Sequence, residues 1–68
     1  MIMKLMEFLE NPNFYKGGAT VKLERERCVE DAYICFIGED DEKYILLDGR
    51  FTLAELKAII EYADKYSF

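Results

Sequence analysis

A hairpin pattern in the second half of the chain constrains the fold more than any other feature. An apolar run at residues 32–37 and a second run at residues 43–48 flank four consecutive acids. Polar residues suit a tight turn, and the first run is apolar on both faces, which predicts a central strand. We therefore expect an antiparallel hairpin whose turn lies at residues 39–42.

The length of this turn determines which side chains share a face of the sheet. A turn of two or four residues places Ile37 opposite Tyr44 and Cys35 opposite Leu46, whereas a turn of three residues breaks this register. With an even turn, one face carries Ile34, Phe36, Ile45 and Leu47, and the other carries Tyr33, Cys35, Ile37, Tyr44 and Leu46. Both faces are therefore apolar.

Helical and strand patterns on either side complete the predicted fold. Residues 2–10 place apolar side chains at helical spacing and end before Asn11-Pro12. Residues 19–28 alternate and carry charges at their far end, which predicts an exposed edge strand. A capping box, Thr52 to Glu55, begins a C-terminal helix. Its apolar stripe consists of Leu53, Leu56, Ile59, Ile60 and Ala63.

The sequence therefore predicts an α+β fold that forms one small domain over residues 1–68. Its core is a three-stranded antiparallel meander, preceded by an N-terminal helix and followed by a capped C-terminal helix. If both helices cover one face of the sheet, the apolar set that includes Tyr33 and Tyr44 stays exposed, and such a patch usually marks an interface. If the first helix lies on the opposite face, it covers that set instead.

Cysteine use and the N-terminal segment indicate the cellular compartment. Cys28 and Cys35 form no CxxC pair, and a chain without histidine cannot complete a zinc site from two cysteines. We expect free thiols, with a Cys28–Cys35 bridge as the alternative. The first ten residues are too short and too charged for a signal peptide or a membrane span. These features predict a reduced, cytoplasmic protein that does not associate with membranes.

Most of the net charge of −5 comes from one stretch of the chain. Residues 30–42 hold six acids and no Lys or Arg. Residues 39–42 lack the spaced ligands and the turn glycine of a calcium loop, so we predict no metal site there. Two interpretations of these four acids remain. They form either a solubilising turn or a recognition element whose carboxylates accept hydrogen bonds from Arg or Lys. Such an acidic chain is not expected to bind nucleic acid directly.

The sequence carries no catalytic signature. The chain has no histidine, and its one serine, Ser67, lies beside the C-terminus. No acid–base or nucleophilic constellation can be assembled from what remains. Pairs of carboxylates alone serve glycosidases, but a chain of this size is too small to build a cleft around them. We therefore predict a non-enzymatic interaction protein without a cofactor.

Charge, length and the lack of catalytic residues together resemble the small acidic anti-CRISPR proteins and other phage-encoded inhibitors. Some members of that class imitate DNA. The resemblance implies an inhibitor that acts in the host cytoplasm and blocks a basic nucleic-acid-binding surface, such as that of an effector complex. The carboxylates that would imitate phosphates are Glu30, Asp31, Glu39, Asp40, Asp41 and Glu42, with Glu61 and Asp64 on the last helix.

Two aromatic residues complete the predicted partner-binding set. Tyr33 and Tyr44 lie beside these acids, and tyrosine is favoured at interfaces, although in a small domain it also fills the rim of the core. The alternative function is a homodimeric structural or accessory protein. In that case the apolar sheet face or the wide apolar arc of the N-terminal helix would mediate self-association.

Overall fold

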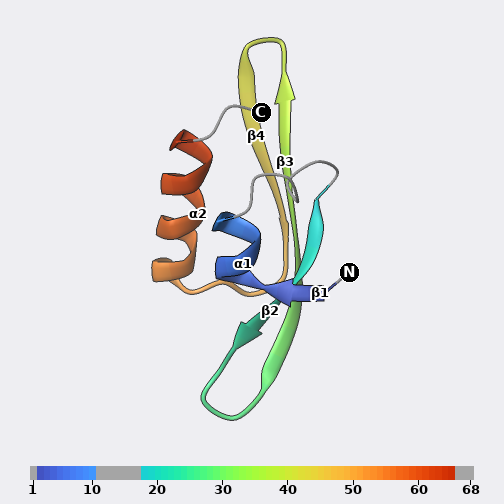
Figure 1. Ribbon diagram of the computed structural model, residues 1–68, viewed down its shortest axis with the longest axis vertical. Coiled ribbons are helices and arrows are strands. Elements are labelled where there is room, and N and C mark those ends of the chain that lie inside the picture. Colours follow the sequence, from blue (N-terminus) through green and yellow to red (C-terminus); the bar gives the residue numbers. More distant parts are fainter. Residues whose placement is uncertain (1, 11–17, 66–68) are drawn as a thin grey trace.

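The computed structural model describes residues 2–10 and 18–65, which form an α+β arrangement of a four-stranded mixed sheet and two helices (Figure 1). The loop that we expect after Asn11 lies outside these residues. The elements are β1 (Ile2–Lys4), α1 (Leu5–Glu10), β2 (Ala19–Glu24), β3 (Val29–Glu39), β4 (Glu42–Asp48) and α2 (Leu53–Lys65). The strands lie in the order β1-β2-β3-β4.

The N-terminal segment departs from the sequence prediction. Residues 2–4 form a strand that pairs parallel to β2, with Met3 opposite Val21, and the helix begins only at Leu5. The sheet is therefore mixed and four-stranded rather than a three-stranded antiparallel meander, and β2 is not an edge along its first half. The helical spacing of residues 2–10 gives no sign of this strand. The strand forms because the backbone of β2 satisfies its hydrogen bonds and because Met3 is buried in the core.

The central hairpin follows the predicted register. β3 pairs antiparallel with β4, which places Ile37 opposite Tyr44 and Cys35 opposite Leu46. Asp40 and Asp41 form a two-residue turn, and both have left-handed backbone angles, with φ of 50° and 66°. This combination is typical of a type I′ turn, whose twist matches that of the flanking strands. β3 lies between β2 and β4 and is the central strand predicted.

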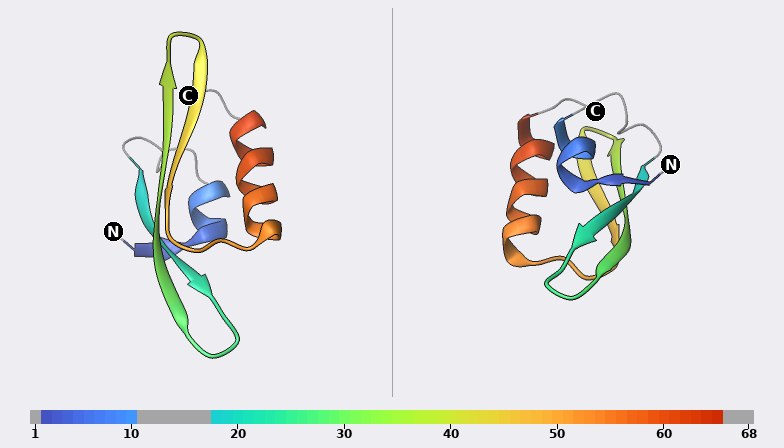
Figure 2. Two further views of the ribbon diagram at one scale, coloured as in Figure 1. Left: turned by 180° about the vertical axis from the view of Figure 1, so that it is seen from behind. Right: turned by 60° about the horizontal axis from the view of Figure 1, so that its bottom comes forward.

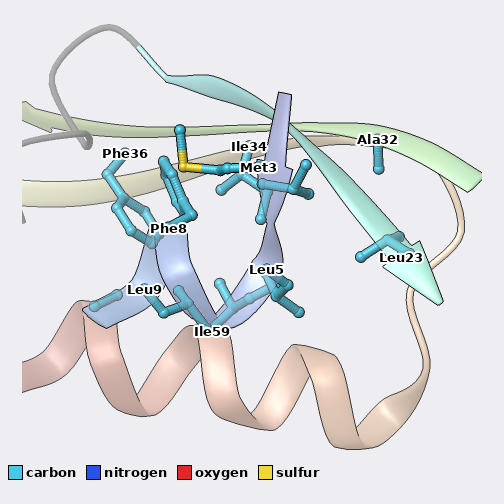
Figure 3. Packing of buried hydrophobic residues seen from close by; sticks show 11 residues of the cluster. Met3, Leu5, Phe8, Leu9, Leu23, Ala32, Ile34, Phe36 and Ile59 are labelled. Carbon is cyan, nitrogen blue, oxygen red and sulfur yellow. The ribbon is translucent and has the colours of Figure 1, made fainter. Parts of the chain in front are cut away.

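Both helices pack on the same face of the sheet (Figures 1 and 2). In Figure 3, α1 lies between the sheet and α2, with Phe8 directed toward Phe36 and with Leu5 and Leu9 near Ile59. The Phe8 and Phe36 ring centroids are 5.5 Å apart. The buried apolar residues are Met3, Leu5, Phe8, Leu9, Val21, Leu23, Ala32, Ile34, Phe36, Ile59 and Ala63. Of the two arrangements considered for the helices, the chain adopts the one in which both described helices share a face, and neither of them covers the other face of the sheet.

The N-terminus of α2 has the predicted capping box. The Glu55 amide donates to Thr52 Oγ1 over 3.1 Å, and the Thr52 amide donates to Glu55 Oε1 over 2.7 Å. We expect Thr52→Ala to lower the free energy of unfolding by about 1 kcal/mol, because one amide of the first turn loses its acceptor. Urea titration monitored by circular dichroism measures this, and Thr52→Ser, which keeps the hydroxyl, is the control. Equal stability of the alanine variant would contradict this assignment of the cap.

The outer side of α2 differs from the predicted stripe. Ile59 and Ala63 are buried, but Leu53 and Ile60 are 84% and 60% exposed. These two side chains are exposed because α1 occupies part of the space between α2 and the sheet, so only one flank of α2 reaches the core (Figure 3).

The two cysteines are free thiols, with Cys28 exposed and Cys35 half-buried, as expected from the sequence.

Candidate interaction surface

The sheet face that no described helix covers carries the second apolar set of the hairpin. We call this surface the open face. Tyr44 and Leu46 are 52% and 53% exposed, Ile37 is 36% exposed, and Tyr33 and Cys35 are half-buried. These side chains lie on consecutive cross-strand pairs of β3 and β4, so they form one continuous patch. A large exposed apolar surface of this kind is typical of a binding site.

Carboxylates border the open face at both ends. Glu39 and Glu42 pair with each other directly beyond Ile37 and Tyr44. At the other end, Asp48 lies opposite Tyr33. Asp31 follows on β3, opposite Lys22 of β2. From Glu42 to Asp48 the strand extends about 20 Å, at roughly 3.3 Å per residue. The structure therefore brings the acids and the apolar face together in one surface.

The hairpin extends beyond the rest of the sheet as a two-stranded arm, formed by residues 35–46. The pairing of β2 with β3 ends at Ile34, and Figure 1 shows β3 and β4 continuing past the other strands. The four acids at its end are all exposed, and among the described residues no ion pair involves them. We call these residues, Glu39, Asp40, Asp41 and Glu42, the tip acids.

The tip acids are unfavourable for stability in two ways. Aspartate tolerates left-handed backbone angles better than most residues, but type I′ turns prefer Asn-Gly over the Asp-Asp found here. Like charges placed directly opposite each other, as in Glu39 and Glu42, also destabilise a strand pair.

The remaining predicted acids lie in three different environments. Glu30 is turned toward the helix side of the sheet and forms ion pairs with Arg25 and Arg50, so its carboxylate is engaged within the chain. Asp31 is exposed on the open face. Glu61 and Asp64 are exposed on α2, which packs on the opposite side of the sheet (Figure 1). The structure brings Asp31 and the tip acids to one face, and it separates the other three from them.

Arg25 is the centre of an ion-pair cluster that the sequence analysis did not identify. Its side chain is only 18% exposed, and it donates to both Glu55 carboxylate oxygens over 3.0 Å and to the Arg50 carbonyl over 2.6 Å. Its Nε also lies 3.5 Å from Glu30. The prediction of a solvated edge is therefore wrong for Arg25, whereas Glu24, Glu26 and Arg27 are exposed as expected. The available signal was the strand alternation, which places Arg25 on the inward side with Val21 and Leu23.

The carboxyl groups of this cluster have pKa values below their ordinary range. The hydrogen bond from Arg50 is the main cause for Glu30. For Glu55, burial raises the pKa, but the hydrogen bonds from Arg25 and from Thr52 outweigh it. A carboxyl whose pKa is lower in the folded chain stabilises the fold above its unfolded pKa, near 4.3, and loses that contribution as the pH falls.

We therefore expect the melting temperature to decrease as the pH falls from about 5 to about 3, because both carboxyls must then take up protons. The variant Glu30→Gln/Glu55→Gln is the comparison. It should melt at a lower temperature at neutral pH and show a shallower decrease over the same range, because its side chains do not titrate. Melting curves measured at half-unit pH steps test this, and identical pH dependence in the two proteins would contradict the role given to the cluster.

Tyr33 and Tyr44 differ in their availability to a partner. Gly18 precedes β2 with φ of 77°, and its backbone lies so close to the Tyr33 hydroxyl that an added Cβ would be 2.6 Å from it. A hydrogen bond with Cys35, together with burial, raises the pKa of Tyr33. Tyr33 is thus partly enclosed by its own chain, as at the rim of a core. Tyr44 projects from the arm and is the tyrosine with more surface to offer.

Other types of site find no support in the described residues. In residues 2–10 and 18–65, no three side chains of Cys, Asp or Glu gather closely enough to hold a metal ion. No described helix combines the length and apolar content needed to cross a membrane. Comparison of the chain with protein-family models, curated proteins and solved structures gives no match. The open face and its acidic border therefore remain the strongest candidate site.

Proposed function

We propose that this chain is a non-enzymatic binding protein that uses its acidic arm to occupy a basic surface of another protein, and so blocks nucleic acid from that surface. The observation that carries this proposal is the continuity of the tip acids with the exposed apolar patch of Ile37, Tyr44 and Leu46. A charged cluster alone is common on solvated surfaces. A charged cluster at the end of a projecting arm, beside apolar side chains, fits a contact surface.

The two parts of this surface have different physical roles. Carboxylates accelerate encounter with a basic partner and orient it, because their field extends about 8 Å at physiological ionic strength. The apolar patch supplies affinity at short range, since contact there removes Tyr44 and Leu46 from water. A nucleic-acid-binding protein has basic surfaces with exposed aromatic or apolar residues, so an inhibitor of an effector complex, as the resemblance implies, fits this chemistry.

Charge also argues against stacking two open faces on each other. Asp31, Asp48 and the tip acids surround this face, and the two bases that share it among the described residues are Lys22 and Lys4, of which Lys4 is paired with Glu24. Stacking two copies would bring two acidic borders together, which costs free energy unless counter-charges intervene. A basic partner, in contrast, neutralises them. Of the two functions predicted from sequence, the geometry favours the acidic ligand over a homodimer that uses this face.

Neutralising the tip acids tests the proposal. In the variant Glu39→Gln/Asp40→Asn/Asp41→Asn/Glu42→Gln, we expect at least a tenfold weaker capture of basic nucleic-acid-binding proteins from a bacterial lysate, mainly through slower association. The fold should survive, because Asn tolerates left-handed backbone angles and the neutral pair removes a repulsion. Captured proteins are identified by mass spectrometry, and their association rates are measured with the purified chains.

A matched control separates the position of the charge from its amount. The variant Glu10→Gln/Glu26→Gln/Glu61→Gln/Asp64→Asn loses the same formal charge from exposed positions outside the arm. We expect it to capture the same proteins as the native chain, and added duplex DNA to release them. If the control variant binds as weakly as the tip variant, net charge explains the effect and the proposed site is wrong.

A further inference from the structure

The outer edge of β4 is unusually long and apolar for an edge strand of a small sheet. β4 has seven residues, with the run Tyr44-Ile45-Leu46-Leu47 at its centre, and no described strand pairs with its outer side. The other edge, β1, has three residues and ends at Lys4. Natural sheets protect their edges with short strands or charges, and β1 follows that rule. β4 carries charges only toward its two ends, at Glu42, Lys43 and Asp48, so its long apolar centre is suited to pairing with another strand.

The register of the hairpin shows which backbone groups point outward from β4. Glu42 closes the two-residue turn with Glu39, so alternate residues of β4 from Glu42 bond to β3. The amides and carbonyls of Ile45 and Leu47 therefore point away from β3. Both side chains are half-buried on the helix side of the sheet. This edge thus offers backbone donors and acceptors next to apolar side chains.

The flank of α2 on the same side of the molecule is apolar as well. Ala58 faces the opposite end of the sheet, because it lines a cavity with Lys4 and Leu5. At 100° per residue, Ile60 lies about 200° ahead of Ala58 around the helix axis, and Leu53 lies about 140° behind it. Both residues therefore lie next to each other on the side of α2 opposite Ala58. Leu53 and Ile60 therefore occupy the flank directed away from β1, on the β4 side. They are two of the most exposed large apolar side chains described.

We propose that a second copy of this chain pairs antiparallel along β4, which joins the two sheets into one, while Leu53 and Ile60 pack against the same residues of the partner subunit. A two-fold axis satisfies both contacts at once, because an antiparallel strand pair and an antiparallel helix pair share that symmetry. The surface is self-complementary, so it closes after two copies. Side chains of the open face stand perpendicular to the sheet, so the face used for the proposed function stays accessible.

Charge selects the register of this pairing. An axis through Ile45 places Glu42 opposite Asp48 of the partner subunit, which is unfavourable. An axis through Leu46 places Leu46 opposite its own copy, Ile45 opposite Leu47 of the partner subunit, and Tyr44 opposite Asp48 of the partner subunit. In this register the outward amide and carbonyl of Ile45 face those of Leu47 of the partner subunit, so they can form hydrogen bonds. No two carboxylates lie directly opposite each other. We therefore place the axis at Leu46.

The size of the edge predicts a reversible dimer. Seven strand residues span about 23 Å, and a sheet layer with a helix layer is roughly 20 Å deep, which gives a contact near 450 Å² per copy. The area buried on both copies together lies close to the lower limit for a specific interface, about 1,000 Å². Each copy also carries a net charge of −5, so repulsion opposes association. We expect dissociation constants in the range of about 10 to 100 µM and tighter association in salt.

Sedimentation equilibrium from about 5 to about 500 µM tests the dimer, at about 0.05 and about 0.5 M NaCl. We expect a monomer–dimer equilibrium that salt strengthens. Leu53→Lys/Ile60→Lys should raise the dissociation constant at least tenfold, whereas Met6→Lys/Val29→Lys should not. The control pair is also exposed and apolar and adds the same charge, but it lies away from the β4 edge. A strict monomer in high salt, or equal effects of the two variants, would overturn the proposal.

Cysteine cross-linking tests the register independently. In a Cys28→Ser/Cys35→Ala background, Leu46→Cys places two thiols at the axis, where Cα atoms of such a pair are about 4.5 Å apart, within disulfide range. Tyr44→Cys is the control, since the two introduced cysteines would be about 13 Å apart. We expect dimeric disulfide from Leu46→Cys only. Equal cross-linking of both contradicts the register. Salt separates this proposal from the proposed function, because it tightens the dimer and weakens binding to a basic partner.

Discussion

Replacing Phe8 with alanine is expected to unfold the chain at room temperature. Phe8 is fully buried, and it lies between the sheet and α2 in contact range of Phe36 (Figure 3). Its truncation removes the apolar contacts that α1 makes with the sheet and costs about 3–5 kcal/mol. A core of this size supplies only about 3–5 kcal/mol in total, so the variant has little or no stability left. Far-UV circular dichroism and urea titration measure the effect.

Phe8→Leu is the matched control for this prediction. It keeps an apolar side chain between the two layers, so it should retain a cooperative transition with a smaller loss of stability. The position matters because α1 has only six residues and would not form alone. Phe8 therefore attaches α1 to the sheet, and Leu5 and Leu9 face α2 (Figure 3). A Phe8→Ala variant that melts within a few degrees of the native chain would mean that α1 does not lie between the layers.

Gly49→Ala is the second change with a large expected effect. Gly49 connects β4 to α2 with φ of 129°, a conformation that side chains of L residues rarely adopt. An added Cβ would also lie 2.7 Å from the Cβ of Ala32 on β3. We expect a loss of about 1–3 kcal/mol from backbone strain, with a further loss if β3 must move. Chemical denaturation of the purified variant gives the value.

Gly38→Ala separates this strain from the general effect of adding a methyl group. Gly38 lies within β3 and does not have a positive φ, so alanine should be tolerated there with little change. Ala32→Gly in the Gly49→Ala chain removes the side-chain collision but not the strained backbone, so it should restore only part of the loss. Full stability of Gly49→Ala alone would show that the turn can adopt another conformation.

The hairpin and the helix cap were predictable from local chemistry. An even turn between two apolar runs determines which residues lie opposite each other, so Ile37 pairs with Tyr44 once the turn has two or four residues. Thr52 and Glu55 satisfy the first amides of α2 from within four residues of sequence, so no distant contact is needed. The acidic turn was likewise visible, because charges at a hairpin turn reach solvent whatever packs below.

The candidate site was predicted only in part. The tip acids and Tyr44 are exposed as the sequence suggested, but Glu30 is bound by Arg25 and Arg50 from distant turns. No local pattern reveals such a partner, since Arg50 is 20 residues away. Leu53 and Ile60 have helical spacing typical of a core stripe, yet they are exposed. Spacing shows that residues share a side of a helix, but it does not show which element occupies the space beside them.

The sequence by itself determined the hairpin register, the cap of α2, the composition of both sheet faces and the concentration of acids at the turn. These depend on contacts between near neighbours in the chain, for which alternation and capping rules suffice. Only the tertiary structure decided that residues 2–4 form a strand beside β2, and that α1 and α2 share one face. Both outcomes depend on which distant surfaces bury the most apolar area together, and many sequences with the same local patterns could satisfy that requirement differently.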